Sequence, residues 1–305
     1  MDARVLVTGG AGFIGSHSVE ALLDAGAQVR VLDNFSSGRR ANLPASHPRL
    51  SVTEGDIRDA AAVAAALAGV THVLHLAAQI FVQVSIREPV ESCHTNVIGF
   101  LNVMDGARRA GVKRMVYASS AAVYGTPEQL PLDEDARTAP LSPYGLEKCI
   151  NDQYAALYRR LYGFSAMGLR YFNVYGPRQD PASPYSGVIS KWSDALRAGR
   201  ALRIFGDGQQ TRDFIYVKDI ARYNVLALQR DEGGVCNVGT GNSVTLLTLI
   251  DALESAAGAK AERQFEPPAP GDIQASGMSP KRLNDLFGAQ SATPLLDGLR
   301  ALLQS

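Results

Sequence analysis

In the first 171 residues, short apolar runs alternate with longer segments of helical character. The apolar runs are rich in Val and Leu, which is typical of parallel strands covered by helices on both faces. The predicted strands are Arg4–Thr8, Gln28–Asp33, Leu50–Glu54, His72–Leu76, Arg114–Ser119 and Ala166–Tyr171. Six strands separated by helices predict an α/β fold, a Rossmann-type doubly wound parallel sheet.

This rhythm breaks after Tyr171, where prolines and glycines accumulate around Gly176-Pro177 and residues 180–184. Smaller mixed elements follow, so we expect a second lobe. Residues 1–172 are assigned to a dinucleotide-binding domain. Residues 173–305 are assigned to a smaller mixed α/β substrate-binding lobe, with some segments returning to the first domain. Ligands of open parallel sheets lie beyond the carboxyl ends of the strands, where we expect that lobe to hold the second reactant.

Composition favours an ordinary folded enzyme, since 46% of the 305 residues are hydrophobic and 20% are charged. Thirty basic residues balance thirty acidic ones without a basic run, so we expect neither a nucleic-acid nor a membrane partner. Cys93, Cys149 and Cys236 lie far apart without metal-ligand spacing, which predicts reduced thiols and no metal site. The N-terminus leads directly into the first strand, without a signal-peptide pattern. We therefore expect a cytoplasmic protein.

A G-x-x-G-x-x-G pattern, formed by Gly9, Gly12 and Gly15, lies between the first predicted strand and the first helix. Glycines there let the backbone turn tightly and approach a pyrophosphate, which the helix N-terminus attracts. The chain has 29 glycines, so chance spacing is the alternative. The position between strand and helix favours a dinucleotide site.

Asp33 ends the second predicted strand, where a carboxylate accepts hydrogen bonds from the adenosine ribose and repels a 2′-phosphate. This favours NAD over NADP. Arg39 and Arg40 could be taken to favour NADP, but they lie several residues beyond the strand, where solvation is the simpler explanation. Asp56-Ile57 follows the third strand and is expected to flank the adenine. An exposed turn carboxylate is the alternative for Asp56.

Tyr144 and Lys148 form the only Y-x-x-x-K in the chain, and helical spacing places both on one face. A free phenol titrates near pH 10, so a phenolate near neutrality needs the ammonium and a positively charged nicotinamide beside it. A chance pair on a helix is the alternative. Ser119-Ser120 ends the fifth strand at the same sheet edge, where a serine can hydrogen-bond the reacting hydroxyl. A turn serine is the other interpretation.

With these motifs, the chain resembles the extended short-chain dehydrogenase/reductase family, and within it the NAD-dependent UDP-sugar 4-epimerases. The resemblance covers nearly the whole chain. It rests on Thr8–Gly15, Leu32–Asn34, Gly55–Ile57, His75–Ala78, Ser119-Ser120, Val123–Gly125, Ser142–Lys148, Arg170–Arg178 and Gly206–Phe214.

The resemblance implies that Ser120 and Tyr144 flank the reacting hydroxyl and that Lys148 holds the nicotinamide ribose. It implies a tightly bound NAD, regenerated at each turnover. The implied cofactor contacts are Gly9, Gly12, Phe13, Ile14, Gly15, Asp33, Asn34, Asp56, Ile57, Leu76, Ala77, Ala78, Asn96, Ser119, Tyr144, Lys148 and Tyr171. The implied substrate contacts are Ser85, Ser120, Tyr144, Asn173, Gly187, Val188, Arg212, Asp272 and Ser276.

The nature of the reaction is indicated by the residues after Ser120. Dehydratases of the family carry an Asp-Glu pair there, because elimination of water needs an additional acid and base. This chain has Ala121 and Ala122. A ketone formed from the sugar can then only be reduced again, which predicts C4 epimerisation of a UDP-hexose through a transient 4-keto sugar. The alternatives are a UDP-uronic acid 4-epimerase, a reductase, a decarboxylase, or a non-catalytic scaffold that binds NAD and a nucleotide sugar.

The resemblance implies that substrate size depends on Ser276. Relatives restricted to UDP-glucose and UDP-galactose carry a tyrosine at this position. A serine leaves room for an acetamido group, so we expect interconversion of UDP-GlcNAc and UDP-GalNAc, with the unacetylated pair as additional substrates that the same pocket would accept. Similar epimerases carry a diphosphate-binding arginine where this chain has Ala269, which lowers the expected affinity for the nucleotide unless Arg178 or another residue substitutes. The resemblance also implies a homodimer, formed by helices near Pro89–Ala110 and Pro143–Leu161.

Overall fold

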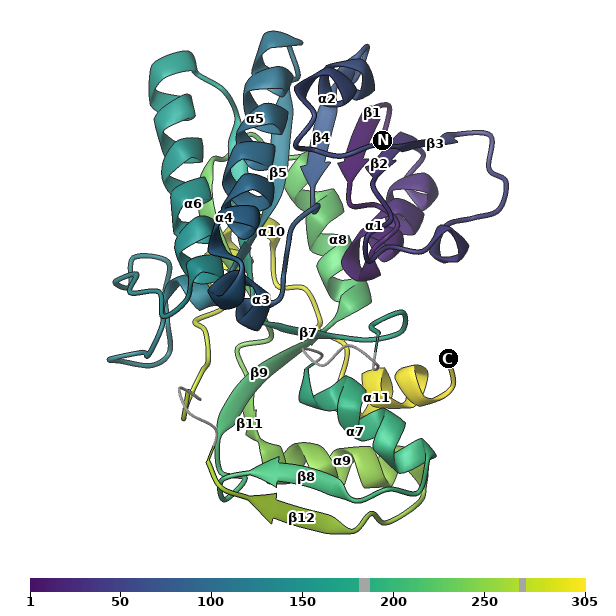
Figure 1. The fold of residues 1–305 in the computed structure, drawn as a ribbon, viewed down its shortest axis with the longest axis vertical. Helices are drawn as coiled ribbons and strands as arrows, with labels where there is room; N and C mark the ends of the chain where they lie inside the picture. Colours follow the sequence, from purple (N-terminus) through teal and green to yellow (C-terminus); the bar gives the residue numbers. More distant parts are fainter. Residues whose placement is uncertain (181–186, 269–272) are drawn as a thin grey trace. The chain divides into compact units, whose positions relative to one another are not determined.

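The computed structural model describes residues 1–180, 187–268 and 273–305, which form two compact units (Figure 1). The first unit comprises residues 1–125, 137–171 and 220–236. The second comprises the described parts of residues 126–136, 172–219 and 237–305. The chain therefore passes between the units more than once, and each unit is built from segments distant in sequence.

The first unit contains a seven-stranded sheet with the strand order β10-β6-β5-β4-β1-β2-β3. Its strands are β1 (Arg4–Thr8), β2 (Gln28–Asp33), β3 (Leu50–Glu54), β4 (His72–His75), β5 (Arg114–Ser120), β6 (Ala166–Tyr171) and β10 (Gly234–Val238). The pairs formed among β1 to β6 are all parallel. The order of these six strands is that of a doubly wound Rossmann sheet, so the predicted fold class is confirmed.

Helices cover both faces of this sheet. They are α1 (Phe13–Asp24), α2 (Ala60–Leu67), α3 (Val82–Arg87), α4 (Pro89–Cys93), α5 (Gly99–Arg109), α6 (Pro143–Tyr162) and α8 (Val217–Leu228), with the short turns η1 (Arg40–Asn42), η2 (His94–Ile98) and η3 (Ala121–Val123). In β1, Val5, Leu6 and Val7 are all buried, although neighbouring side chains point to opposite faces. Leu6 belongs to the apolar cluster formed with α2 and α5. This double burial explains the continuous apolar runs in the sequence.

Two strand ends differ from the prediction by one residue. β4 ends at His75 and not at Leu76, although the Leu76 N–H still donates to the Thr8 carbonyl at 3.1 Å. β5 continues through Ser120. The seventh strand, β10, was not predicted, because its five residues lie in the part of the sequence assigned to the second lobe. Strand pairing over such a distance is decided by tertiary packing and not by local pattern.

The second unit has two small sheets. A three-stranded sheet has the order β11-β9-β7, and a two-stranded sheet pairs β12 with β8. These strands are β7 (Asn173–Tyr175), β8 (Leu202–Phe205), β9 (Thr211–Tyr216), β11 (Ser243–Thr245) and β12 (Arg263–Glu266). β9 is antiparallel to β11 and parallel to β7. The accompanying helices are α7 (Val188–Arg197), α9 (Leu246–Ala257), α10 (Lys281–Phe287) and α11 (Leu295–Leu303). The mixed α/β character predicted for this region is confirmed.

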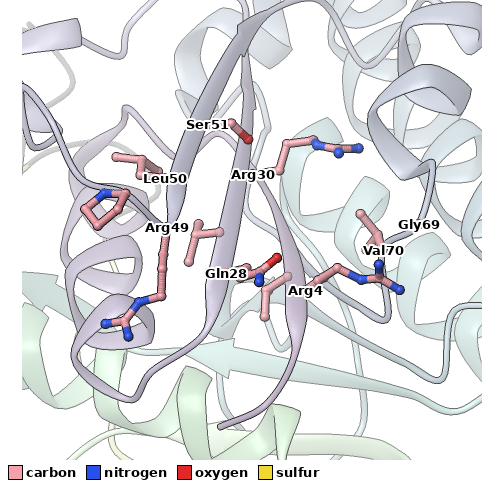
Figure 2. Close-up of a pocket in the computed structure, with 11 residues that line it drawn as sticks. Arg4, Gln28, Arg30, Arg49, Leu50, Ser51, Gly69 and Val70 are labelled. Atoms are coloured by element: carbon pink, nitrogen blue, oxygen red, sulfur yellow. The ribbon is translucent and has the colours of Figure 1, made fainter.

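A pocket of about 270 Å³ lies in the first unit at the amino ends of β1, β2 and β3. Figure 2 shows residues that line it. Its lining includes Arg4, Arg30 and Arg49. Arg30 donates to the carbonyls of Ala66 and Ala68 at the end of α2, at 2.7 and 3.0 Å. Arg49 likewise donates to a carbonyl near the end of α1. Cations at helix C-termini offset the helix dipole, so these two arginines support the fold.

In the described part of the chain, no helix combines the length and the apolar character needed to cross a membrane.

Candidate active site

The glycine-rich loop joins β1 to α1 in a conformation that only glycine adopts easily. Gly9 has φ +70°, and a Cβ there would lie 2.6 Å from the backbone nitrogen of Ala77. A Cβ on Gly15 would overlap the Gly9 carbonyl oxygen. Gly12 precedes α1 and has no side chain with which to cap it, so the N–H groups of Phe13 and Ile14 remain available at the helix N-terminus. This cradle fits a pyrophosphate.

The predicted adenosine-side residues form a connected group at the carboxyl ends of β2 and β3. The buried Asp33 carboxylate accepts hydrogen bonds from the N–H groups of Ala11 and Phe35, at 2.8 and 2.9 Å. Asn34 donates to Asp56 at 2.9 Å. The side-chain hydrogen bond from Arg58 holds the pKa of Asp56 well below its usual value. Asp56 is therefore part of a network and is firmly ionised.

Ile57 is buried directly after Asp56. A Cβ added to Gly99 of α5 would lie 2.7 Å from the Ile57 side chain, so the two residues pack closely. The structure thus places Ile57 in the apolar core beneath the Asp56 turn. Contact of this pair with adenine stays a prediction.

The segment after β4 lies against the glycine loop, as the closeness of Gly9 to Ala77 shows. Leu76 and Ala78 flank Ala77 in this segment. Asn96, in the π-helical turn η2, forms hydrogen bonds with the backbone N–H and carbonyl of Gln79, the residue after Ala78. Its Oδ1 accepts from the Gln79 N–H and its Nδ2 donates to the Gln79 carbonyl, each at 2.8 Å. Asn96 therefore supports the loop after β4 through the backbone at Gln79, and its contact with the cofactor stays a prediction.

The three predicted catalytic residues come together at the start of α6. Ser142 caps this helix by accepting from the Gly145 N–H, and Pro143 occupies its first turn. The Lys148 ammonium lies 5.7 Å from the centre of the Tyr144 ring and donates to the Ala118 carbonyl at 2.9 Å. Ser120, at the end of β5, shares a side-chain hydrogen bond with Tyr144.

Burial dominates the electrostatics of this group. Burial lowers the pKa of Lys148 to about 8, while the carboxylates of Asp152 and Glu147 oppose the change. Lys148 therefore remains mostly cationic at neutral pH. Burial also raises the pKa of Tyr144, and the Glu147 charge adds to this, while the hydrogen bond to Ser120 lowers it. Without a further positive charge, Tyr144 is a neutral phenol; the charge of an oxidised nicotinamide favours its phenolate.

Three other predicted residues direct their hydroxyls to protein groups. Ser119 donates to Asp152 at 3.1 Å, and Tyr171 donates to Asn224 at 2.6 Å. Ser85 is fully buried; it donates to the Val82 carbonyl and accepts from the Tyr144 N–H. The structure thus gives Ser119, Ser85 and Tyr171 supporting hydrogen bonds, and their contact with a ligand stays a prediction.

Four of the predicted substrate residues line one cavity of the second unit, with a volume of about 880 Å³. They are Asn173, Gly187, Val188 and Arg212. Asn173 is fixed by a hydrogen bond from its Nδ2 to the Asp213 carbonyl at 3.0 Å. Residues far apart in sequence therefore share one site.

Ser276 is not among the residues that line this cavity. Its N–H donates to the Thr211 carbonyl at 3.1 Å, next to Arg212 on β9. Asp272 and Ala269 lie outside the described residues.

The cavity also contains residues that the sequence did not single out. These include Lys191, Trp192, Arg203 and Phe205. One signal was present: in β8, Leu202 and Ile204 are buried while the alternate residues Arg203 and Phe205 point outward. This alternation shows which β8 side chains face the cavity, but exposed aromatic residues are common on protein surfaces, so the pattern alone does not mark a binding site.

Comparison with known proteins assigns the chain to a family. Residues 5–239 match the NAD dependent epimerase/dehydratase family. The chain belongs to this family. The UDP-glucose 4-epimerase of Mycolicibacterium smegmatis is 40% identical over 301 residues, which cover 97% of this chain and 96% of that protein.

Solved structures of other family members are similar throughout their length. The UDP-N-acetylglucosamine 4-epimerase from Methanobrevibacter ruminantium, in complex with UDP-N-acetylmuramic acid, has a TM-score of 0.96 at 36% identity, covering 99% of this chain and 97% of that chain. The UDP-glucose 4-epimerase from Thermus thermophilus, in complex with NAD, has a TM-score of 0.90 at 39% identity, with coverages of 99% and 98%.

Family membership confirms two expectations from the sequence. The resemblance to the extended short-chain dehydrogenase/reductase epimerases is correct, and the cofactor is NAD. The protein is therefore an NAD-dependent epimerase, and the glycine cradle between β1 and α1 fits that cofactor.

Proposed function

We propose that the protein interconverts UDP-hexoses by epimerisation at C4. The observation that carries this proposal is the grouping of Ser120, Tyr144 and Lys148 at the carboxyl edge of the sheet. Ala121 and Ala122 follow Ser120 in the η3 turn, so these positions provide no acid or base for elimination. Oxidation followed by reduction is the reaction that this set of groups supports.

In the proposed reaction, Tyr144 accepts the proton of the sugar C4 hydroxyl. Ser120 hydrogen-bonds the same oxygen, and the Lys148 cation stabilises the Tyr144 phenolate. NAD supplies the electron-pair acceptor in the first half of the cycle and the donor in the second. The 4-keto sugar turns over between the two halves, and Tyr144 then returns its proton to the oxygen. The cycle consumes no net reductant.

The cavity of the second unit supports the proposal of a nucleotide-sugar substrate. Arg212 provides a guanidinium suited to bidentate contact with a diphosphate, and Gly187-Val188 is proposed to border the uracil. A volume of about 880 Å³ lies within the range of small-molecule sites. The similar proteins from M. smegmatis and M. ruminantium are named for UDP-glucose and UDP-N-acetylglucosamine, respectively. We include both sugar types in the proposal.

The direct test is to incubate the holoenzyme with a panel of UDP-sugars and to follow the products by NMR. We expect interconversion of C4 epimers without accumulation of NADH. Net NADH turnover or release of carbon dioxide would instead support a reductase or a decarboxylase. Interconversion of uronic acids alone would support a UDP-uronic acid 4-epimerase. Tight binding of NAD and UDP-sugar without any product would support a non-catalytic scaffold.

Substrate size is tested by Ser276→Tyr. If the small Ser276 side chain leaves room for an acetamido group, tyrosine should lower kcat/KM for UDP-GlcNAc and UDP-GalNAc at least about tenfold and largely spare UDP-glucose. The matched control is Ser46→Tyr at an exposed position of the first unit. Equal loss on both sugar pairs, or no effect on either, would show that Ser276 does not set substrate size.

A further inference from the structure

Glu147 is a buried carboxylate that the proposed reaction steps do not use. It lies in α6 between Tyr144 and Lys148 and is only 4% exposed. Its Oε2 accepts from the Ser92 hydroxyl at 2.9 Å and from the Asn96 amide at 2.6 Å. Its Oε1 is also buried and has no hydrogen-bond partner among the described residues. Burying a carboxylate with one unbonded oxygen costs free energy, so the presence of Glu147 at this position calls for an explanation beyond packing.

The contacts of Glu147 lead to the cofactor cradle. Asn96 uses the rest of its amide to hold both backbone groups of Gln79, each at 2.8 Å. Gln79 follows the segment in which the Ala77 backbone lies against Gly9. The Asn96 amide cannot rotate without losing its hydrogen bonds to both Gln79 backbone groups and to Glu147. The orientation of Asn96, and hence the position of this loop, therefore depends on the acceptor that Glu147 provides.

We propose that Glu147 is a positioning residue for the NAD site, because its carboxylate fixes the Asn96 amide and Asn96 in turn fixes the backbone at Gln79 beside the glycine loop. The proposal rests on NAD as the cofactor of the family and not on the identity of the sugar. Ser92 of α4 contributes to the same arrangement by donating to the Glu147 oxygen that Asn96 uses. Glu147 itself touches neither the reacting atoms nor the glycine loop in the proposed role.

The test measures how fast NAD dissociates from the full-length holoenzyme in three variants. Glu147→Ala leaves the Ser92 and Asn96 donors without their acceptor, and we expect NAD to dissociate at least about tenfold faster. Glu147→Gln keeps one acceptor oxygen at the same reach, so we expect a rate within about threefold of the unchanged protein. Glu147→Asp keeps the charge but shortens the reach, and should also release NAD faster than Glu147→Gln does.

Glu254→Ala is the matched control. Glu254 is another buried glutamate, located in the second unit and bonded to Lys260 and Arg263, so its loss should leave NAD dissociation unchanged. A purely structural role of Glu147 would lower the melting temperature without changing the rate of NAD release. The proposal is overturned if the Glu147→Ala protein folds and releases NAD at the same rate as the unchanged protein.

If the Glu147→Ala protein does not fold, the proposal is tested by comparing the NAD dissociation rates of the Glu147→Gln and Glu147→Asp proteins. Equal NAD dissociation in Glu147→Gln and Glu147→Asp overturns the proposal, and faster release from the Asp variant supports it. Because NAD release is measured without sugar, the result is independent of whether C4 epimerisation is the reaction.

Discussion

At the scale of single residues, Tyr144 carries the proton transfer of the proposed reaction. Replacing it with Phe removes the hydroxyl and keeps the ring, so folding and NAD binding should persist. We expect kcat to fall at least about a hundredfold, the scale of lost general-base catalysis. Steady-state kinetics and the NAD content of the purified protein check this. Tyr162→Phe, at an exposed tyrosine near the end of the same helix, is the control. Near-normal turnover of Tyr144→Phe would remove Tyr144 from the mechanism.

His75, at the end of β4, gives the fold a pH dependence. Burial lowers its pKa to about 3, and Nδ1 is hydrogen-bonded to the Thr8 hydroxyl at 2.8 Å. The unfolded chain, with a histidine pKa near 6.5, therefore takes up this proton more readily, and the folded state loses stability as the pH falls below about 6.5.

The size of this effect can be measured by urea unfolding. Between pH 7 and pH 5, protonation of His75 in the unfolded chain should lower the unfolding free energy by about 2 kcal/mol. The His75→Asn protein should not show this decrease. Asn offers Thr8 either a hydrogen-bond donor or an acceptor and does not titrate in this range. An equal loss in both proteins would show that other groups cause the acid sensitivity.

At the scale of elements, we propose that the end of β2 and the glycine loop together select the dinucleotide. The Asp33 carboxylate accepts a hydrogen bond from the Ala11 N–H of the loop, which fixes the side chain at the strand end. A 2′-phosphate brought there would meet an anion in a largely buried setting. We expect NADP to bind at least about tenfold more weakly than NAD in calorimetric titrations. Arg40→Ala, beyond the strand, should not change the preference; tighter binding of NADP would contradict the assignment.

At the scale of the whole molecule, we propose that the apolar side chains left exposed on α3, α4, η2 and α6 form a homodimer interface. Ile86, Val90, Ile98 and Leu146 are between 46% and 70% exposed. Their elements pack beside one another in the first unit (Figure 1). Exposed apolar side chains on neighbouring helices are expected at an interaction site.

Light scattering tests this proposal. The unchanged protein should have twice the chain mass, and Val90→Glu should shift it towards a monomer because a charge is costly in an apolar interface. Phe265→Glu, at an exposed apolar residue of the second unit, is the matched control. A monomeric unchanged protein, or a dimer indifferent to Val90→Glu, would exclude this surface as the interface.

The sequence by itself determined the features that depend on local pattern. Four of the six predicted strands have the ends that the structure shows, because continuous apolar runs reflect burial on both faces of the sheet. Gly9, Gly12 and Gly15 were identifiable from their spacing between a predicted strand and a predicted helix. Tyr144 and Lys148 were identifiable because helical spacing places them on one face and Ser119-Ser120 ends a predicted strand at the same sheet edge.

Only the tertiary structure decided which distant residues meet. It added β10 to the sheet edge, and it joined Glu147 to Ser92 and Asn96, which are more than fifty residues away in sequence. It also placed Arg203 and Phe205 in the cavity that holds Asn173 and Arg212. Hydrogen bonds and cavities of this kind depend on the three-dimensional approach of separate elements. A one-dimensional pattern of apolar and polar positions records burial and spacing, but it does not record which buried groups become partners.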